Sequence, residues 1–266
     1  MNASKTTGWL LIIGVIGSMA FGLSNAAATA DWSNDLAMLT ALSTDVDWTK
    51  LSLILSAIGQ IVIVLGMGGI KDAMSGGVGH KYASMAIWFL AIGATLNLIW
   101  SAMLGLTGDQ WSSKNAAEAA AGAYAAAGNA AGAQAAAGGA GIAAGIALSA
   151  WATAIAIGAA GTISTFIGVT LLGKGLTIQK SLHTIKIIWN IPWLAALITI
   201  FGIIGVVVTI SDSRSTLMFI PWIGTFVIML IIGLGTIGTP VLKKFISERL
   251  LFVSLCDTKR SLATKE

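Results

Sequence analysis

The sequence predicts an all-α integral membrane protein, a bundle of about six transmembrane helices. Of its 266 residues, 56% are hydrophobic and only 10% are charged, and the mean hydropathy is +0.87. Soluble domains usually carry about 25% charged residues, so this chain lacks the polar surface that a water-soluble core would need. Apolar runs without any Asp, Glu, Lys, Arg or His recur along the chain. We therefore expect lipid to be the solvent for most of it.

Six of these runs have the length of about 20 residues that a helix needs to cross the hydrocarbon core. They cover residues 9–28, 51–70, 82–106, 151–172, 187–210 and 217–239. Glycines within and beside the spans, as in Gly141-Ile142-Ala143-Ala144-Gly145, are expected to let neighbouring helices approach closely. Residues 1–240 then form a transmembrane domain, and residues 241–266 form a basic juxtamembrane tail.

The distribution of Lys and Arg predicts the orientation. If both termini lie on one side, only three of the 15 basic residues, Lys50, Lys114 and Arg214, fall on the other side. The positive-inside rule then places both termini in the cytoplasm, with the plasma (inner) membrane as the expected location. A second interpretation concerns the first span: Lys5, an apolar stretch and Ala28-Thr29-Ala30 also resemble a cleavable signal peptide. Cleavage would leave five spans.

Two further features bear on the architecture. The outer segment 107–139 is rich in Ala and Gly, and we expect it to be a frayed helix or a mobile cap lying over the outer face. A lid or an oligomer contact through Gly128-x-x-x-Gly132 is the alternative. In addition, Gly59-Gln60-Ile61 resembles Gly161-Thr162-Ile163, which indicates a weak parallel repeat of a helical hairpin. The sixth span would pair with the first as a third hairpin.

Polar side chains inside the spans are the candidate site. Gln60 and Asn97 lie midway along the second and third spans, and an amide in hydrocarbon must find a partner. We expect them to face the bundle interior, either as a bond between helices or as the lining of a path for a polar solute. Thr162, Ser164 and Thr165 of the fourth span are expected to line the same space.

Metal or haem binding has weaker support. The only two histidines, His80 and His183, both precede a span on the cytoplasmic side, and two imidazoles can ligate haem or a metal. No cysteine, carboxylate or third histidine stands nearby to complete a zinc site. We therefore expect solvated loop histidines and no cofactor.

The sequence points to no catalytic chemistry, because no paired carboxylates, Ser/His set or His/Cys cluster falls within the spans. Nucleic acid is not an expected partner, since the basic residues lie between apolar runs and form no single face. The basic tail is expected to contact anionic lipid. The best interpretation is a structural or accessory subunit that packs against copies of itself or other membrane subunits. The alternative is a passive channel for a neutral or weakly polar solute.

Overall fold

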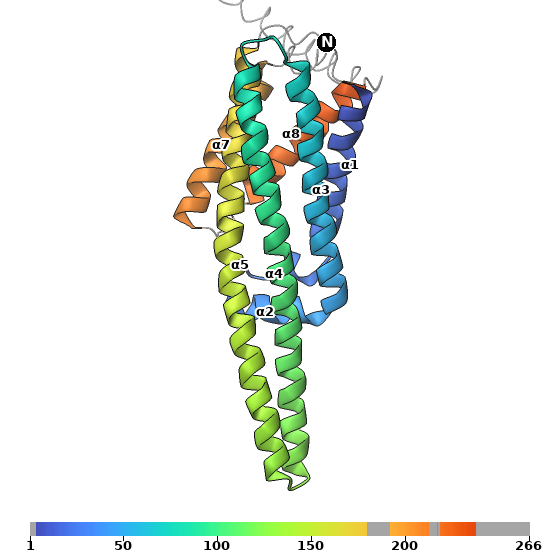
Figure 1. Cartoon of the computed structure of the whole chain (residues 1–266), viewed down its shortest axis with the longest axis vertical. Helices are drawn as coiled ribbons and strands as arrows, with labels where there is room; N and C mark the ends of the chain where they lie inside the picture. The colour runs from blue at the N-terminus through green and yellow to red at the C-terminus, as the bar shows by residue number, and fades with distance from the viewer. Residues whose placement is uncertain (1–3, 180–191, 213–216, 218, 238–266) are drawn as a thin grey trace, which may run out of the picture.

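The computed structural model describes residues 4–179, 192–212, 217 and 219–237, and every regular element in these ranges is helical. The predicted all-α fold is confirmed. Figure 1 shows a bundle of long helices in which α4 and α5 extend far beyond the others. The elements are α1 (Lys5–Gly22), the 3₁₀ turn η1 (Ala26–Ala28), α2 (Asp35–Thr44), α3 (Val46–Ala73), α4 (His80–Ala126), α5 (Ala130–Ile178), α7 (Pro192–Ser211) and α8 (Phe219–Ile237).

Five of the described helices, α1, α3, α4, α5 and α8, are long and apolar enough to cross a membrane. The corresponding apolar stretch of α7, Ala195–Ser211, is slightly shorter, and residues 187–191 of its predicted span lie outside the described residues. Large apolar side chains also cover the outside of the bundle, where Trp88, Leu65 and Ile13 are each more than half exposed. An apolar exterior around an apolar core indicates a membrane protein.

The first helix starts and ends earlier than the predicted span 9–28. It starts at Lys5 because the Ser4 hydroxyl accepts a hydrogen bond from the Thr7 amide (3.2 Å) and caps the first turn. It ends at Gly22 because the next polar side chains bond back to the last carbonyls. The Ser24 hydroxyl donates to the Phe21 carbonyl (2.9 Å), and the Asn25 side chain donates to the Gly22 carbonyl (3.4 Å).

The six long helices form a ring in the order α1, α3, α4, α5, α7, α8, in which each helix packs on the next and α8 packs on α1. The three hairpins of the predicted repeat, α3–α4, α5–α7 and α8–α1, are therefore neighbouring pairs around this ring. The second copy of the repeated turn, including His183, lies outside the described residues, so the repeat stays a prediction.

Glycines allow the backbones of neighbouring helices to approach closely, as predicted. Where α1 crosses α3, a Cβ added to Gly59 would lie 2.6 Å from the Ser18 amide nitrogen and 2.9 Å from the Gly14 carbonyl oxygen. Where α4 crosses α5, a Cβ on Gly93 would lie 3.0 Å from the Gly161 carbonyl oxygen. Any larger residue at these positions would force the helices apart.

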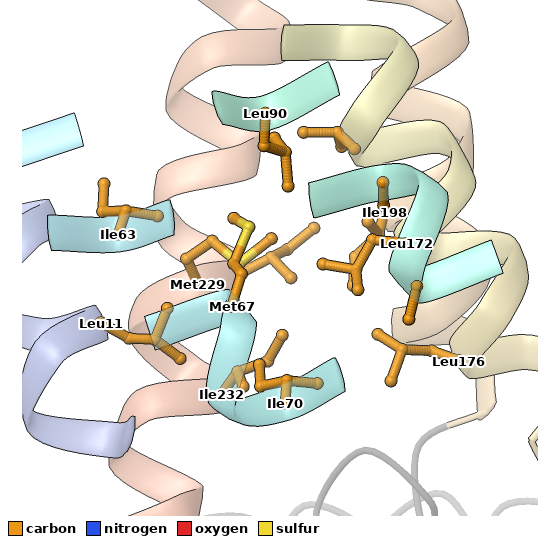
Figure 2. Close-up of a cluster of buried hydrophobic side chains, with 14 of the residues drawn as sticks. Leu11, Ile63, Met67, Ile70, Leu90, Leu172, Leu176, Ile198, Met229 and Ile232 are labelled. Atoms are coloured by element: carbon orange, nitrogen blue, oxygen red, sulfur yellow. The ribbon is translucent and has the colours of Figure 1, made fainter. Parts of the chain in front are cut away.

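The interior of the ring is filled by apolar side chains (Figure 2). Each of the six helices contributes at least one fully or nearly fully buried residue: Leu11, Ile63, Met67, Ile70, Leu90, Leu172, Leu176, Ile198, Met229 and Ile232 are labelled in Figure 2. Leu11 has no exposed surface, so α1 is an integral part of this core. Removal of residues 1–30 as a signal peptide stays a prediction.

Candidate functional site

The most distinctive feature of the molecule is the length of α4 and α5, which have 47 and 49 residues. At 1.5 Å per residue each is about 70 Å long, more than twice the thickness of a hydrocarbon core. Their distal parts, residues 109–126 and 130–148, run side by side beyond the rest of the bundle (Figure 1). We call these two segments and their turn the arm. By the same rise per residue the arm reaches roughly 27 Å past Gly108.

The expectation of a frayed helix or a mobile cap over the outer face is wrong, since the arm is a helical hairpin that points away from the bundle. Its turn is well specified. Gly128 adopts φ +71°, a conformation that glycine tolerates, and the Asn129 side chain accepts from the Gly132 amide (2.9 Å) to start α5. The pair Gly128 and Gly132 therefore builds the turn itself. The many alanines favour helix strongly enough to offset the other glycines.

The arm has two distinct faces. Ala140, Ala143 and Ala147 of α5, followed by Ala150 just beyond the arm, are buried at the spacing of one helical face, on the side of α5 that packs on α4. The glycines Gly138, Gly141 and Gly145 fall on the opposite face of α5, and a Cβ on any of them would meet no atom within 4 Å. The predicted close contact through Gly141 and Gly145 is thus absent from the described part of the chain. Their face is open.

The charge pattern divides the arm into a base and a distal part. Asp109, Lys114 and Glu118 are its only charged residues, and none occurs between Ala119 and Leu148. The Lys114 ammonium lies 2.8 Å from the Glu118 carboxylate and 4.6 Å from the Trp111 ring centroid. The α5 half of the arm, which carries no charge, exposes isoleucine, with Ile142 69% exposed and Ile146 43% exposed. An uncharged surface with exposed isoleucine is better suited to contact with another apolar surface than to water.

A short helix that was not predicted from the sequence supports the base of the arm. The apolar face of α2 (Met38, Leu39, Leu42) packs into a cluster with Leu104 of α4 and Trp151 of α5. The Trp151 indole nitrogen also donates to the Asp35 carboxylate (3.0 Å), and Lys50 of α3 forms an ion pair with Asp109 of α4. We call α2 and these contacts the collar. Its signals in the sequence were the Asn34 cap, which accepts from the Ala37 amide (3.1 Å), and the helical spacing of the three apolar residues.

Tryptophans gather at the same level. The Trp32 ring lies 6.0 Å from the Trp100 ring and 6.3 Å from the Trp151 ring, measured between centroids. Beside them in the α1–α2 connection, Ser33 donates its amide (2.9 Å) and its hydroxyl (2.6 Å) to Asp31, which lowers the pKa of that carboxyl. Because amphipathic rings prefer a membrane–water boundary, this cluster marks the boundary between bundle and arm.

The amides predicted from the spans meet each other. The Asn97 side-chain nitrogen donates to the Gln60 side-chain oxygen (2.7 Å), which joins α4 to α3 in the middle of the bundle. Asn97 is only 4% exposed. A hydrogen bond between two helices is the arrangement that the interhelical interpretation of these residues required.

The fourth-span residues are only partly brought to this point. Thr165 lines a small cavity together with Gln60, and its hydroxyl donates to the Gly161 carbonyl (2.9 Å). Thr162 and Ser164 are half-buried on α5, and they do not line that cavity. Their predicted role in lining a path receives no support from their position.

His80 lies at the first residue of α4, where it fastens the α3–α4 turn. Its Nδ1 donates to the Lys71 carbonyl (3.2 Å), and its Nε2 lies 3.4 Å from the Ser84 hydroxyl. The described residues contain no group of three or more His, Cys, Asp or Glu side chains that could hold a metal ion. His183 lies outside the described ranges, as does the basic tail.

One residue that positions the bundle was not singled out in the sequence. Gln179, just after α5, is 4% exposed, and its side-chain oxygen accepts from the Gly79 amide (2.9 Å) at the α3–α4 turn. Its position next to Lys180 is typical of a solvated loop residue.

No protein-family model, no curated protein and no solved structure matches this chain.

Proposed function

We propose that the protein is a non-catalytic structural or accessory subunit of a membrane assembly, and that the arm is its docking element. The arm carries this proposal. It holds about 40 residues in a helical hairpin whose α5 half carries no charge, and a Cβ on Gly138, Gly141 or Gly145 of its outer face would meet no atom within 4 Å.

The open face of α5 indicates the kind of partner. Gly138, Gly141 and Gly145 would let another backbone approach closely, and Ile142 beside them would contribute apolar area. The complementary surface is a helix with small apolar residues, from another subunit or from a second copy of this chain. The collar supports this role because its contacts join the base of the arm to α2 and α3 of the bundle.

The remaining parts of the proposal rest on charge. The excess of basic residues on the side of the termini supports a plasma (inner) membrane protein with its arm outside the cytoplasm. The basic tail would contact anionic lipid on the inner surface.

Native mass spectrometry of the protein extracted gently from its own membrane tests the proposal. The wild-type chain should carry a partner or a second copy, and the double variant Gly141→Leu with Gly145→Leu should lose it while remaining folded. The matched control is Gly68→Leu, because Gly68 of α3 also meets no atom within 4 Å but lies in the bundle. A lone wild-type chain, or a partner that survives the double arm variant, would contradict the docking role.

A passive channel is the second candidate function, and the buried Gln60–Asn97 pair beside a small cavity inside the ring is the observation that favours it. Its path would run past the Gln60–Asn97 pair. Flux of a neutral solute into liposomes should then depend on the protein and fall with Gln60→Leu. Absence of protein-dependent flux for water, ammonia and small alcohols would remove this candidate.

A further inference from the structure

A small cavity lies at the centre of the helix ring and is independent of the arm. Its volume is about 30 Å³, and the amide and hydroxyl side chains of its lining are Gln60 of α3, Thr165 of α5 and Thr225 of α8. The rest of the lining is mostly apolar and includes Met67, Leu90 and Met229, which Figure 2 shows in the middle of the core.

Thr225 is the unusual residue of this lining. It is 5% exposed, and its hydroxyl oxygen has no hydrogen-bond partner among the described residues. Other threonines of the bundle donate to the carbonyl four residues earlier in their own helix: Thr165, Thr170, Thr177, Thr199, Thr209 and Thr236. A buried hydroxyl without a partner in hydrocarbon is costly, so its partner should be sought inside the cavity.

The cavity matches what an internal water molecule needs. A water requires at least roughly 10–15 Å³ of such space and two to four polar partners. Most of this lining is apolar, so a bound water depends on the few polar groups that border the cavity. Three partners are available. Gln60 accepts from Asn97 through its oxygen and keeps its amide hydrogens, Thr165 donates to Gly161 and keeps its lone pairs, and the Thr225 hydroxyl can both donate and accept.

We propose that this cavity is a hydration site, in which an ordered water molecule hydrogen-bonds the Thr225 hydroxyl and the side chains of Gln60 and Thr165. The water joins α8 to the opposite side of the ring. Without it, α8 packs chiefly on its two neighbours, α1 and α7. The site extends the Gln60–Asn97 bond into a polar network that links α4, α3, α5 and α8 at one level of an otherwise apolar core.

Solid-state NMR of the full-length, isotope-labelled protein in lipid bilayers tests the site, with polarisation transferred from water protons. The Thr225 side-chain signal should rise several-fold faster than that of Thr209. Thr209 is the matched control because it is 4% exposed and its hydroxyl already donates to the Gly205 carbonyl (2.6 Å). Equal, slow transfer to both threonines would overturn the proposal.

A second measurement uses Thr225→Val, which removes the hydroxyl and keeps the shape of the side chain. If a water is bound, the variant should lose water transfer to the Gln60 amide and melt at a lower temperature than wild type. If the cavity is dry, the variant removes a buried polar group without a partner and should melt at the same or a higher temperature. That second result would also overturn the proposal. Thr209→Val, measured in parallel, corrects for the loss of any threonine hydroxyl.

Discussion

At the scale of single residues, the interior depends on a few polar atoms that must pair because hydrocarbon offers no alternative. The Gln60–Asn97 bond is the clearest case. We predict that Gln60→Leu and Asn97→Leu each destabilise the bundle, and that a double-mutant cycle yields a coupling of about 0.6 kcal/mol, at most about 1.7 kcal/mol. Reversible unfolding in mixed detergent micelles measures it. A coupling of zero would show that the two amides act independently.

A glycine at a helix crossing should be far less replaceable than a glycine of the same helix that faces lipid. Gly59→Ala would place a Cβ 2.6 Å from the Ser18 amide nitrogen, whereas Gly68→Ala on the same helix meets no atom within 4 Å. We predict that Gly59→Ala costs about 1–3 kcal/mol, in the range of overpacked cores. Gly68→Ala should leave the unfolding free energy unchanged or raise it slightly, by up to about 1 kcal/mol of helix propensity. Equal effects of the two substitutions on the free energy of unfolding would contradict the close approach of α1 and α3 at Gly59.

Whether a buried polar residue could be predicted from sequence depended on whether its side chain can find a hydrogen-bond partner within its own helix or in solvent. Gln60 and Asn97 stood out because an amide cannot satisfy itself within a helix. Thr225 did not, because a threonine normally bonds to its own helix, and only the three-dimensional structure shows that this one does not. Gln179 was hidden because a polar residue beside a lysine at the end of a span is usually solvated.

At the scale of elements, the spans followed from apolar runs, and the arm did not. Segment 107–139 carries both strong helix formers and helix breakers, so local propensity does not distinguish a stable helix from a frayed one. What decides is pairing: Ala140, Ala143 and Ala147 of α5 are buried in the hairpin with α4, and an antiparallel partner stabilises a helix that would fray alone. The open glycines contribute nothing to that pairing.

Replacing a glycine of the arm by alanine should therefore have opposite effects on the stability of the arm at two kinds of position. Gly138→Ala with Gly139→Ala should stabilise it by roughly 1 kcal/mol per site, since both face open space in a helix. Gly128→Ala should destabilise the turn by about 1–2 kcal/mol, because φ there is +71°. Amide hydrogen exchange along residues 115–145 would show slower exchange in the first variant and faster exchange in the second. Faster exchange in the Gly138/Gly139 variant and slower exchange in the Gly128 variant would contradict this structure of the turn.

The collar should hold the arm mainly through the hydrogen bond between Asp35 and the buried Trp151. Asp35→Ala removes the acceptor of the Trp151 indole, whereas Lys50→Ala removes an ion pair whose side chains are 34% and 42% exposed. Exposed pairs contribute about 0–1 kcal/mol, so we predict a larger rise in hydrogen exchange at residues 104–112 for Asp35→Ala. The same exchange experiment in high salt should mimic Lys50→Ala and not Asp35→Ala. A larger effect of Lys50→Ala would show that the ion pair dominates.

At the scale of the whole molecule, the arm and the basic α3–α4 turn lie at opposite ends of the structure. The start of α1 and the α3–α4 turn, with Lys71 and Lys81, stand at one end, and the arm forms the other (Figure 1). The alternation of the predicted spans places these segments on opposite sides, and the distribution of Lys and Arg predicts which side is cytoplasmic. The length of the arm required the structure, because it depends on how two separate segments of the chain pair with each other.

Thiol labelling can determine which side of the membrane the arm occupies. The single cysteine of the chain, Cys256, is first replaced by serine. Gly139→Cys then places a thiol on the open surface of the arm, and Val78→Cys places one in the α3–α4 turn, where Val78 is 76% exposed. With the termini in the cytoplasm, a membrane-impermeant reagent should modify Gly139→Cys in spheroplasts and reach Val78→Cys only after the membrane is permeabilised. Modification in the opposite order would place the arm in the cytoplasm, where its partner would then have to be sought.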